Sequence, residues 1–132
     1  MYQYRAKIVR VIDGDTFTAD IDLGFGIIKR AETFRVSDGT NTMFDTPETF
    51  RPKSEAERAH GLQAKSRAIE ILEGREVIVQ TFRDEAGKYG RFLADVLCYA
   101  DDSDLDAASV GKTYTAIFKD EDLLKLDSYP GD

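Results

Sequence analysis

The sequence predicts a mainly β fold with helices, an α+β class in which five strands and one long helix share a domain. Three observations predict it. Five segments alternate apolar and polar residues or are rich in β-branched and aromatic residues. Glycine-containing turn signals separate the first three segments. A longer segment with helical spacing and capping signals lies between the third and fourth.

The first three strands are expected over residues 3–12, 16–23 and 27–36. The expected apolar positions of the first are Tyr4, Ala6, Ile8 and Val11, and those of the second are Phe17, Ala19, Ile21 and Leu23. Asp13-Gly14 and Gly24-Phe25-Gly26 supply the turns, so these strands are expected to form a meander.

The helix is expected over about residues 54–73. Ser54 and Glu57 have the spacing of a capping box, and Gly74 is a typical stop signal. Four apolar residues recur at helical spacing and are expected to form its core face: Ala59, Leu62, Ile69 and Leu72. His60 lies in the same segment among charged residues, and we expect it on the solvated face.

Two more strands are expected over residues 75–82 and 92–99, and a short helix over 101–110. Residues 120–132 form an acidic amphipathic segment centred on Leu123, Leu124 and Leu126. Five strands with a helix between the third and fourth match an OB-type barrel with short C-terminal helices. From element order alone, a generic α+β sheet fits nearly as well.

The chain length of 132 residues suits one domain, over residues 1–132, with an acidic segment from about residue 101. No apolar run is long enough to span a bilayer, so no membrane association is expected. Cys98 is the only cysteine, which excludes an intramolecular disulfide. The first residues lack a secretory signal, so we expect a protein inside the cell or one whose signal was removed. We expect a monomer.

The formal net charge of −7 is unevenly distributed. Residues 1–100 hold 15 basic and 16 acidic side chains, whereas residues 101–132 hold 3 basic and 9 acidic ones. This distribution argues against a passive, high-affinity nucleic-acid binder. It still allows an enzyme that contacts phosphates locally.

Three short motifs carry the candidate chemistry: Asp13-Gly14-Asp15-Thr16, Asp45-Thr46-Pro47-Glu48 and Lys88-Tyr89-Gly90-Arg91. Together with Arg35 they supply carboxylates that suit a hard divalent cation and guanidiniums that suit a phosphate. A carboxylate beside a metal-bound water is a plausible general base. Each motif alone also has an ordinary interpretation, as a hairpin turn, a capped turn before a helix, or solvated residues at a strand end.

The four segments Val11–Thr16, Thr33–Arg35, Asp45–Thr49 and Lys88–Arg91 together resemble the thermonuclease (staphylococcal-nuclease-like) family over roughly residues 5–100. The resemblance implies an OB-fold barrel and a calcium-dependent, sugar-nonspecific endonuclease. Such an enzyme hydrolyses phosphodiester bonds of DNA and RNA and leaves 3′-phosphates.

The resemblance also implies roles for individual residues. Asp15 and Asp45 match the Ca²⁺ carboxylates, and Thr46 would provide its backbone carbonyl. Glu48 matches the residue that assists water attack. The remaining matches are the phosphate-binding Arg35 and Arg91 and the substrate-binding Lys88 and Tyr89, to which we add Tyr114.

Two departures from the family pattern bear on these assignments. Ten positions separate Arg35 from Asp45, about twice the family spacing, so residues 37–43 either bulge outward or displace Arg35. The region after residue 100 is short and acidic. The alternative functions are a noncatalytic OB-fold module that binds single-stranded nucleic acid or protein, and an interaction domain that uses the acidic tail.

Overall fold

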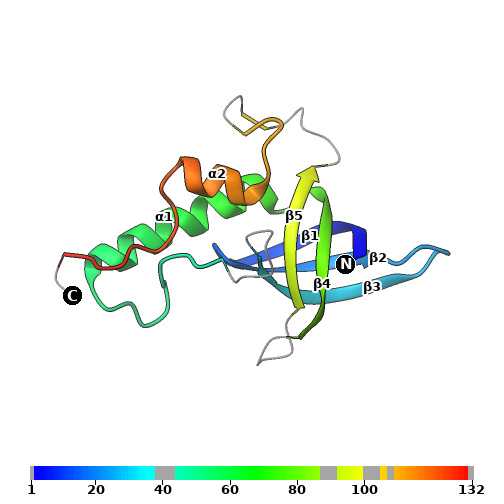
Figure 1. Ribbon diagram of the computed structural model, residues 1–132, viewed down its shortest axis with the longest axis horizontal. Helices are drawn as coiled ribbons and strands as arrows, with labels where there is room; N and C mark the ends of the chain where they lie inside the picture. The colour runs from blue at the N-terminus through cyan, green and yellow to red at the C-terminus, as the bar shows by residue number, and fades with distance from the viewer. Residues whose placement is uncertain (1, 38–43, 87–91, 100–104, 107–108, 131–132) are drawn as a thin grey trace.

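The computed structural model describes residues 2–37, 44–86, 92–99, 105–106 and 109–130, and for 82–86 and Cys98 it describes the backbone alone. Five strands form a closed barrel in the order β1-β2-β3-β5-β4 (Figure 1). The elements are β1 (Tyr2–Asp13), β2 (Thr16–Asp22), β3 (Ile28–Val36), α1 (Glu55–Leu72), β4 (Glu76–Ala86), β5 (Phe92–Tyr99) and α2 (Tyr114–Asp120). The predicted α+β class with an OB-type barrel is confirmed.

The first three strands form the expected antiparallel meander, and β3 joins β5 in parallel to help close the barrel. A register shift between Ile8 and Arg10 changes the side-chain phase of β1. Ala6 and Ile8 therefore share the buried face with Val11, three positions further on. Leu23, expected in the core, lies beyond the end of β2 and is 45% exposed.

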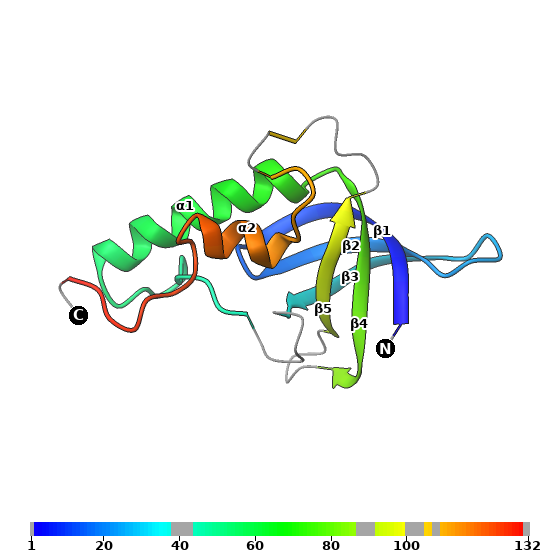
Figure 2. The same cartoon turned by 45° about the horizontal axis from the view of Figure 1, so that its top comes forward.

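Both helices pack at one end of the barrel, and the hairpin between β2 and β3 projects from the other end (Figures 1 and 2). Ser54 caps α1 as predicted, since its hydroxyl accepts a hydrogen bond from the Glu57 backbone at 3.2 Å. The Glu57 carboxylate does not accept a hydrogen bond from the Ser54 N–H, as it would in a capping box. The carboxylate accepts from Lys53 N at 2.9 Å instead.

The predicted core face of α1 is wrong in three of its four residues. Ala59, Leu62 and Ile69 are exposed, and only Leu72 is buried. The helix instead packs through Gly61, Ala64, Ala68, Ile71 and Leu72. Small side chains bring the α1 backbone close to its neighbours, a contact that a search for large apolar residues overlooks.

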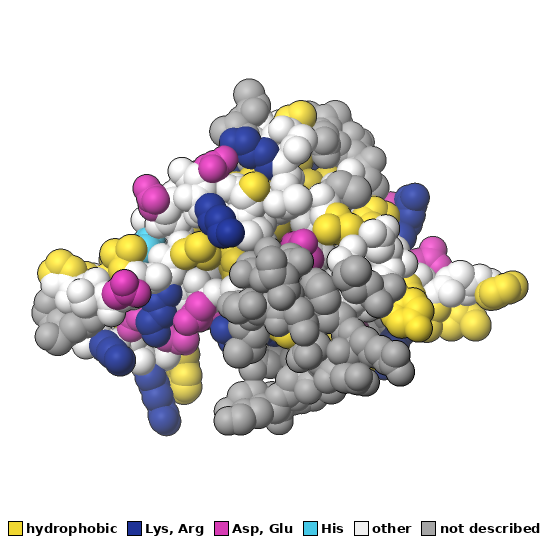
Figure 3. All heavy atoms as spheres, viewed as in Figure 1, with side chains coloured by type: hydrophobic (Ala, Val, Ile, Leu, Met, Phe, Trp, Pro, Cys, Tyr) yellow, Lys and Arg dark blue, Asp and Glu magenta, His cyan; other side chains and the backbone are white. Residues whose placement is uncertain are grey.

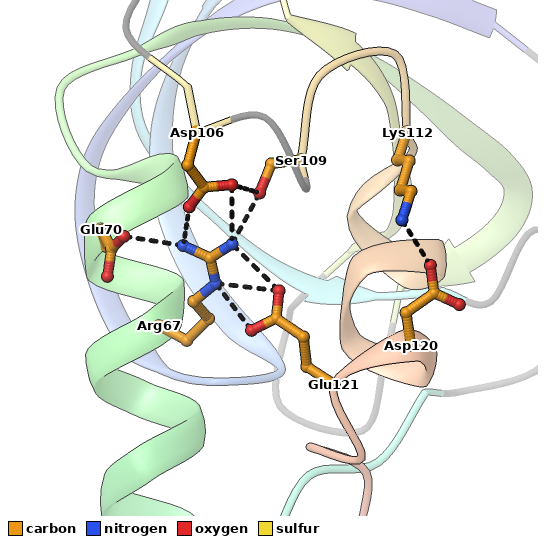
Figure 4. Close-up of polar contacts among 7 residues, drawn as sticks. All are labelled: Arg67, Glu70, Asp106, Ser109, Lys112, Asp120 and Glu121. Carbon is orange, nitrogen blue, oxygen red and sulfur yellow. Dashed lines mark hydrogen bonds and ion pairs between the residues drawn. The ribbon is translucent and has the colours of Figure 1, made fainter.

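A polar cluster around Arg67 ties α1 to the chain that follows the barrel (Figure 4). The Arg67 side chain is 12% exposed and pairs with Glu70 at 2.7 Å, Asp106 at 2.9 Å and Glu121 at 3.0 Å. Ser109 Oγ accepts another hydrogen bond from Arg67 at 2.6 Å. One guanidinium thus joins the helix to Asp106, to Ser109 and to Glu121 at the end of α2.

The C-terminal region differs from the expectation. Most of the helix expected over 101–110 lies outside the described residues, and the four described there are not helical: Leu105, Asp106, Ser109 and Val110. Of the expected apolar centre, Leu123 is buried and Leu126 is 50% exposed. His60 is not simply solvated, because its ring nitrogens lie 2.7 Å from Tyr129 Oη and 2.7 Å from the Asp122 carbonyl oxygen. No helix in the described ranges is long and apolar enough to cross a membrane.

Candidate functional site

Asp15 is the buried centre of the candidate site, at the start of β2 and only 5% exposed. One carboxylate oxygen accepts from Thr16 Oγ1 at 3.0 Å, and the other accepts from Thr46 N at 3.2 Å. Its backbone carbonyl accepts from Val36 N at 2.9 Å. The β1–β2 turn, β3 and the segment after β3 therefore fix this carboxylate together.

Arg35 lies opposite Thr16 in the β2–β3 pairing, so its guanidinium lies beside the carboxylate of Asp15. Its Nη2 is 3.3 Å from Asp15 Oδ2 and 3.3 Å from Asp45 Oδ1. The long spacing between Arg35 and Asp45 therefore does not remove the arginine from the carboxylates. Of the longer segment, residues 38–43 lie outside the described chain.

The segment that carries Asp45 is fixed against β3 and the C-terminal region. Phe44 is buried, its N–H donates to the Val36 carbonyl at 3.2 Å, and its ring packs 5.7 Å from that of Tyr114. The Asp45 carbonyl accepts from Lys125 N at 3.1 Å. The Asp45 side chain itself is 50% exposed, so it faces both Arg35 and solvent.

The carboxyl groups of Asp13, Asp45 and Glu48 lie close enough to that of Asp15 to feel its negative charge. Burial raises the pKa of Asp45, and the negative charge of Asp15 raises it further. Burial and the same Asp15 charge raise the pKa of Glu48. Burial also raises the pKa of Asp13, although the Gly14 N–H opposes that shift. The carboxylates repel one another, and a cation placed among them would relieve this repulsion.

Two glycines allow the segment 44–49 to approach its neighbours closely. A Cβ on Gly14 would lie 2.9 Å from Thr46 Cγ2, and a Cβ on Gly61 would lie 2.8 Å from the Pro47 carbonyl oxygen. The Gly61 position would also place a Cβ 2.9 Å from the Glu48 carbonyl oxygen. The backbone that bears Glu48 thus rests directly on the backbone of α1.

Two buried polar atoms at the site have no hydrogen-bond partner within the described residues: Arg35 Nε and Thr46 Oγ1. Buried polar groups are normally paired, so an unpaired donor beside a cluster of charges needs an explanation. Arg35 Nε is covered in this structure, so an anionic ligand would satisfy it only once the covering atoms moved aside. Among the described residues, no group of three or more His, Cys, Asp or Glu side chains is arranged to hold a metal ion.

The other predicted substrate contacts have different outcomes. Tyr114 has no exposed surface, and its hydroxyl donates to the Gly14 carbonyl. It cannot touch a substrate in this structure, so we assign it to the core as a support for the β1–β2 turn. Lys88, Tyr89 and Arg91 lie outside the described residues.

The structure adds two residues that sequence reasoning did not select. Gly61 supports the Glu48 backbone, and Lys125 bonds to the Asp45 carbonyl. Thr16, which belongs to the first motif, bonds to Asp15. A glycine inside a helical pattern could have indicated a close contact at position 61. No local signal marks Lys125, because its contact joins residues eighty positions apart.

The described site is therefore an acidic cluster with one inserted arginine, built where β2, β3 and the following segment of a five-stranded barrel meet. Residues 42–122 match the family model described as staphylococcal nuclease homologue. The chain belongs to that family, which supports a nuclease-like or nucleic-acid-binding OB fold. No curated protein matches the chain.

Proposed function

We propose that the protein is a calcium-dependent, sugar-nonspecific nuclease that hydrolyses phosphodiester bonds of DNA and RNA. The convergence of Asp15, Arg35 and Asp45 carries the proposal, because three segments of the chain bring opposite charges together. Family membership supports the same reaction class.

The residues that would hold Ca²⁺ are Asp15 and Asp45 through their carboxylates and Thr46 through its carbonyl. All are hard oxygen donors of the kind that Ca²⁺ prefers, and Thr46 N already contacts Asp15. The Arg35 guanidinium now neutralises both carboxylates, which is the charge that a cation would otherwise supply. When bound, the ion would polarise the phosphate and stabilise developing negative charge.

Glu48 is the residue we assign to accept a proton from the attacking water. Pro47 stiffens the loop that leads to Glu48, and the close approach of Gly61 sets the distance of the Glu48 backbone from α1. The water oxygen forms a bond to phosphorus as the bond to the 5′ oxygen breaks. Water protonates the leaving oxygen, since a guanidinium is a poor proton donor, and the products carry a 3′-phosphate and a 5′-hydroxyl.

Arg35 and Arg91 are the residues we assign to the phosphate. The unpaired Nε of Arg35 supports this role, because a guanidinium that uses two donors in parallel binds a phosphate strongly. β5 begins at Phe92, which pairs with Phe34 of β3. Arg35 follows Phe34 in the sequence and Arg91 precedes Phe92, so we keep Arg91 in the proposal. Two guanidiniums would stabilise the extra charge of a pentacoordinate phosphorus transition state.

A noncatalytic OB-fold module that binds single-stranded nucleic acid or protein is the second candidate. The observation in its favour is that Arg35 pairs with both proposed calcium carboxylates. If that pairing persists when divalent cations are present, Arg35 would block the cation site, and binding without turnover would follow.

Digestion of plasmid and single-stranded DNA with Ca²⁺, Mg²⁺ or chelator tests the proposal. Wild type is expected to cleave with Ca²⁺ alone and to leave 3′-phosphate ends, whereas Glu48→Gln and Arg91→Ala lose most of the rate. Absence of cleavage by folded wild type with any metal contradicts the enzyme assignment. Equal cleavage by wild type and both variants contradicts the residue assignment.

A further inference from the structure

Phe50 and Arg51 form an exposed aromatic–cation pair two residues after Glu48. Phe50 is 75% exposed, and Arg51 Cζ lies 5.2 Å from the centroid of its ring. Arg51 adopts φ +54°, a left-handed conformation that is uncommon for a non-glycine residue. The backbone therefore turns sharply at this pair and leaves the ring facing solvent.

The chain on each side of the pair is anchored. Before it, Thr49 Oγ1 donates to Asp13 Oδ2 at 3.3 Å in the β1–β2 turn. After it, Lys53 N donates to the Glu57 carboxylate at 2.9 Å, and Glu57 is only 1% exposed. These anchors fix the backbone on both sides of the exposed ring, which reduces the entropy lost on binding.

The charge beside Phe50 is also available to a ligand. Neither Arg51 nor Lys53 forms an ion pair with another part of the described chain, whereas Arg5, Arg30, Arg67 and Lys112 all do. Figure 3 shows cationic and hydrophobic side chains projecting at the end of the molecule where α1 begins, with acidic side chains beside them. An aromatic face with adjacent cations suits a stacked base and its anionic backbone.

We propose that Phe50 and Arg51 form a subsite that stacks one unpaired nucleobase of a single-stranded nucleic acid beside the phosphodiester bond to be cleaved. Two residues of extended chain span at most about 7 Å, so the backbones of Phe50 and Glu48 lie within that distance of each other. The placement beside a scissile bond rests on the proposed nuclease function. The stacking itself requires only that single strands bind.

The subsite gives the protein a preference for unpaired strands. A duplex stacks its bases on one another, so its bases cannot cover Phe50 without first unstacking, and duplex binding gains nothing from the ring. Every base has an aromatic face, so the subsite selects strand state rather than sequence.

Binding of fluorescein-labelled oligonucleotides, followed by anisotropy with Ca²⁺, tests the proposal in a Glu48→Gln background that prevents cleavage. One probe is a short oligothymidylate, and the other is an abasic strand with the same number of phosphates. Phe50→Leu is expected to weaken oligothymidylate binding about 5-fold or more while leaving abasic binding unchanged. Phe50→Trp is expected to retain wild-type affinity, because it keeps the aromatic face.

Phe25→Leu is the matched control. Phe25 is fully exposed on the β2–β3 hairpin, at the opposite end of the molecule from α1 (Figure 1), and we expect no change with either probe. Equal losses with both probes, an unchanged affinity of Phe50→Leu, or no oligothymidylate binding by the parent protein would each overturn the subsite. A base-dependent loss in this background, together with a folded wild type that cleaves no substrate with any metal, would support the subsite and reject the nuclease.

Discussion

Replacing Gly61 by alanine tests whether α1 sets the position of Glu48. The new Cβ would lie 2.8 Å from the Pro47 carbonyl oxygen and 2.9 Å from that of Glu48, where ordinary contacts begin at 3.4 Å. Both obstacles are backbone atoms, which cannot rotate away as a side chain can. The segment must therefore move by about 0.6 Å, or the helix must recede by that amount.

The stability change should be modest, because two effects oppose each other. Overpacking costs about 1–3 kcal/mol, and the better helix propensity of alanine recovers about 1 kcal/mol. The expected net loss in the free energy of unfolding is therefore about 0–2 kcal/mol. Catalysis is more sensitive to position, since a 1 Å displacement can cost about 100-fold in rate. We expect kcat to fall about 10-fold or more.

The assay is the initial rate of oligonucleotide cleavage at saturating Ca²⁺, with chemical denaturation measured in parallel. Gln63→Ala is the control, because this exposed α1 position receives the same residue without the backbone contact. A Gly61→Ala protein with wild-type kcat and unchanged or increased stability would refute the reasoning. That result would mean that the helix does not determine where Glu48 lies.

Two other predictions concern hydrogen bonds that stabilise the fold, one at the β1–β2 turn and one in the cluster around Arg67. Tyr114→Phe should lower the free energy of unfolding by about 1–3 kcal/mol in chemical denaturation, because it leaves the buried Gly14 carbonyl without its donor; an unchanged midpoint would contradict that role. The hydrogen bond from Arg67 holds the pKa of Asp106 below its usual 3.8, so this contribution to stability is present above that pH and is lost as the pH falls through the lower, folded value. Acid titration should show wild type losing stability more steeply than Asp106→Asn below about pH 4, and parallel curves would contradict it.

The parts of the site that depend on neighbouring strands could be predicted from the sequence. The turn at Gly24-Phe25-Gly26 joins β2 to β3, and the register of that hairpin pairs Thr16 with Arg35. Once that pairing exists, Asp15 and Arg35 must lie close together. The motif around Asp45 adds the third charge, although only the fold shows that the long intervening segment leaves Arg35 at the carboxylates.

The parts that depend on distant packing could not be predicted. Leu62 and Ile69 have the spacing of a core face but are exposed. At Gly61 the backbone of α1 instead lies directly against the backbone of the segment that carries Glu48. Tyr114 was expected to face a substrate, but its ring is buried against Phe44 and Phe118. Such choices depend on three-dimensional complementarity, which neither periodicity nor local motifs encode.

The melting temperature in calcium tests the central claim that Asp15 and Asp45 can exchange the Arg35 guanidinium for a divalent cation. For a dissociation constant of about 1 mM, at the weak end for calcium sites, 10 mM Ca²⁺ adds about 1.4 kcal/mol of stability. For a domain of this size, that corresponds to an increase of about 4–8 °C. We predict this increase in wild type and its loss in Asp45→Asn. An unchanged wild-type melting temperature, or an equal increase in the variant, would contradict the account.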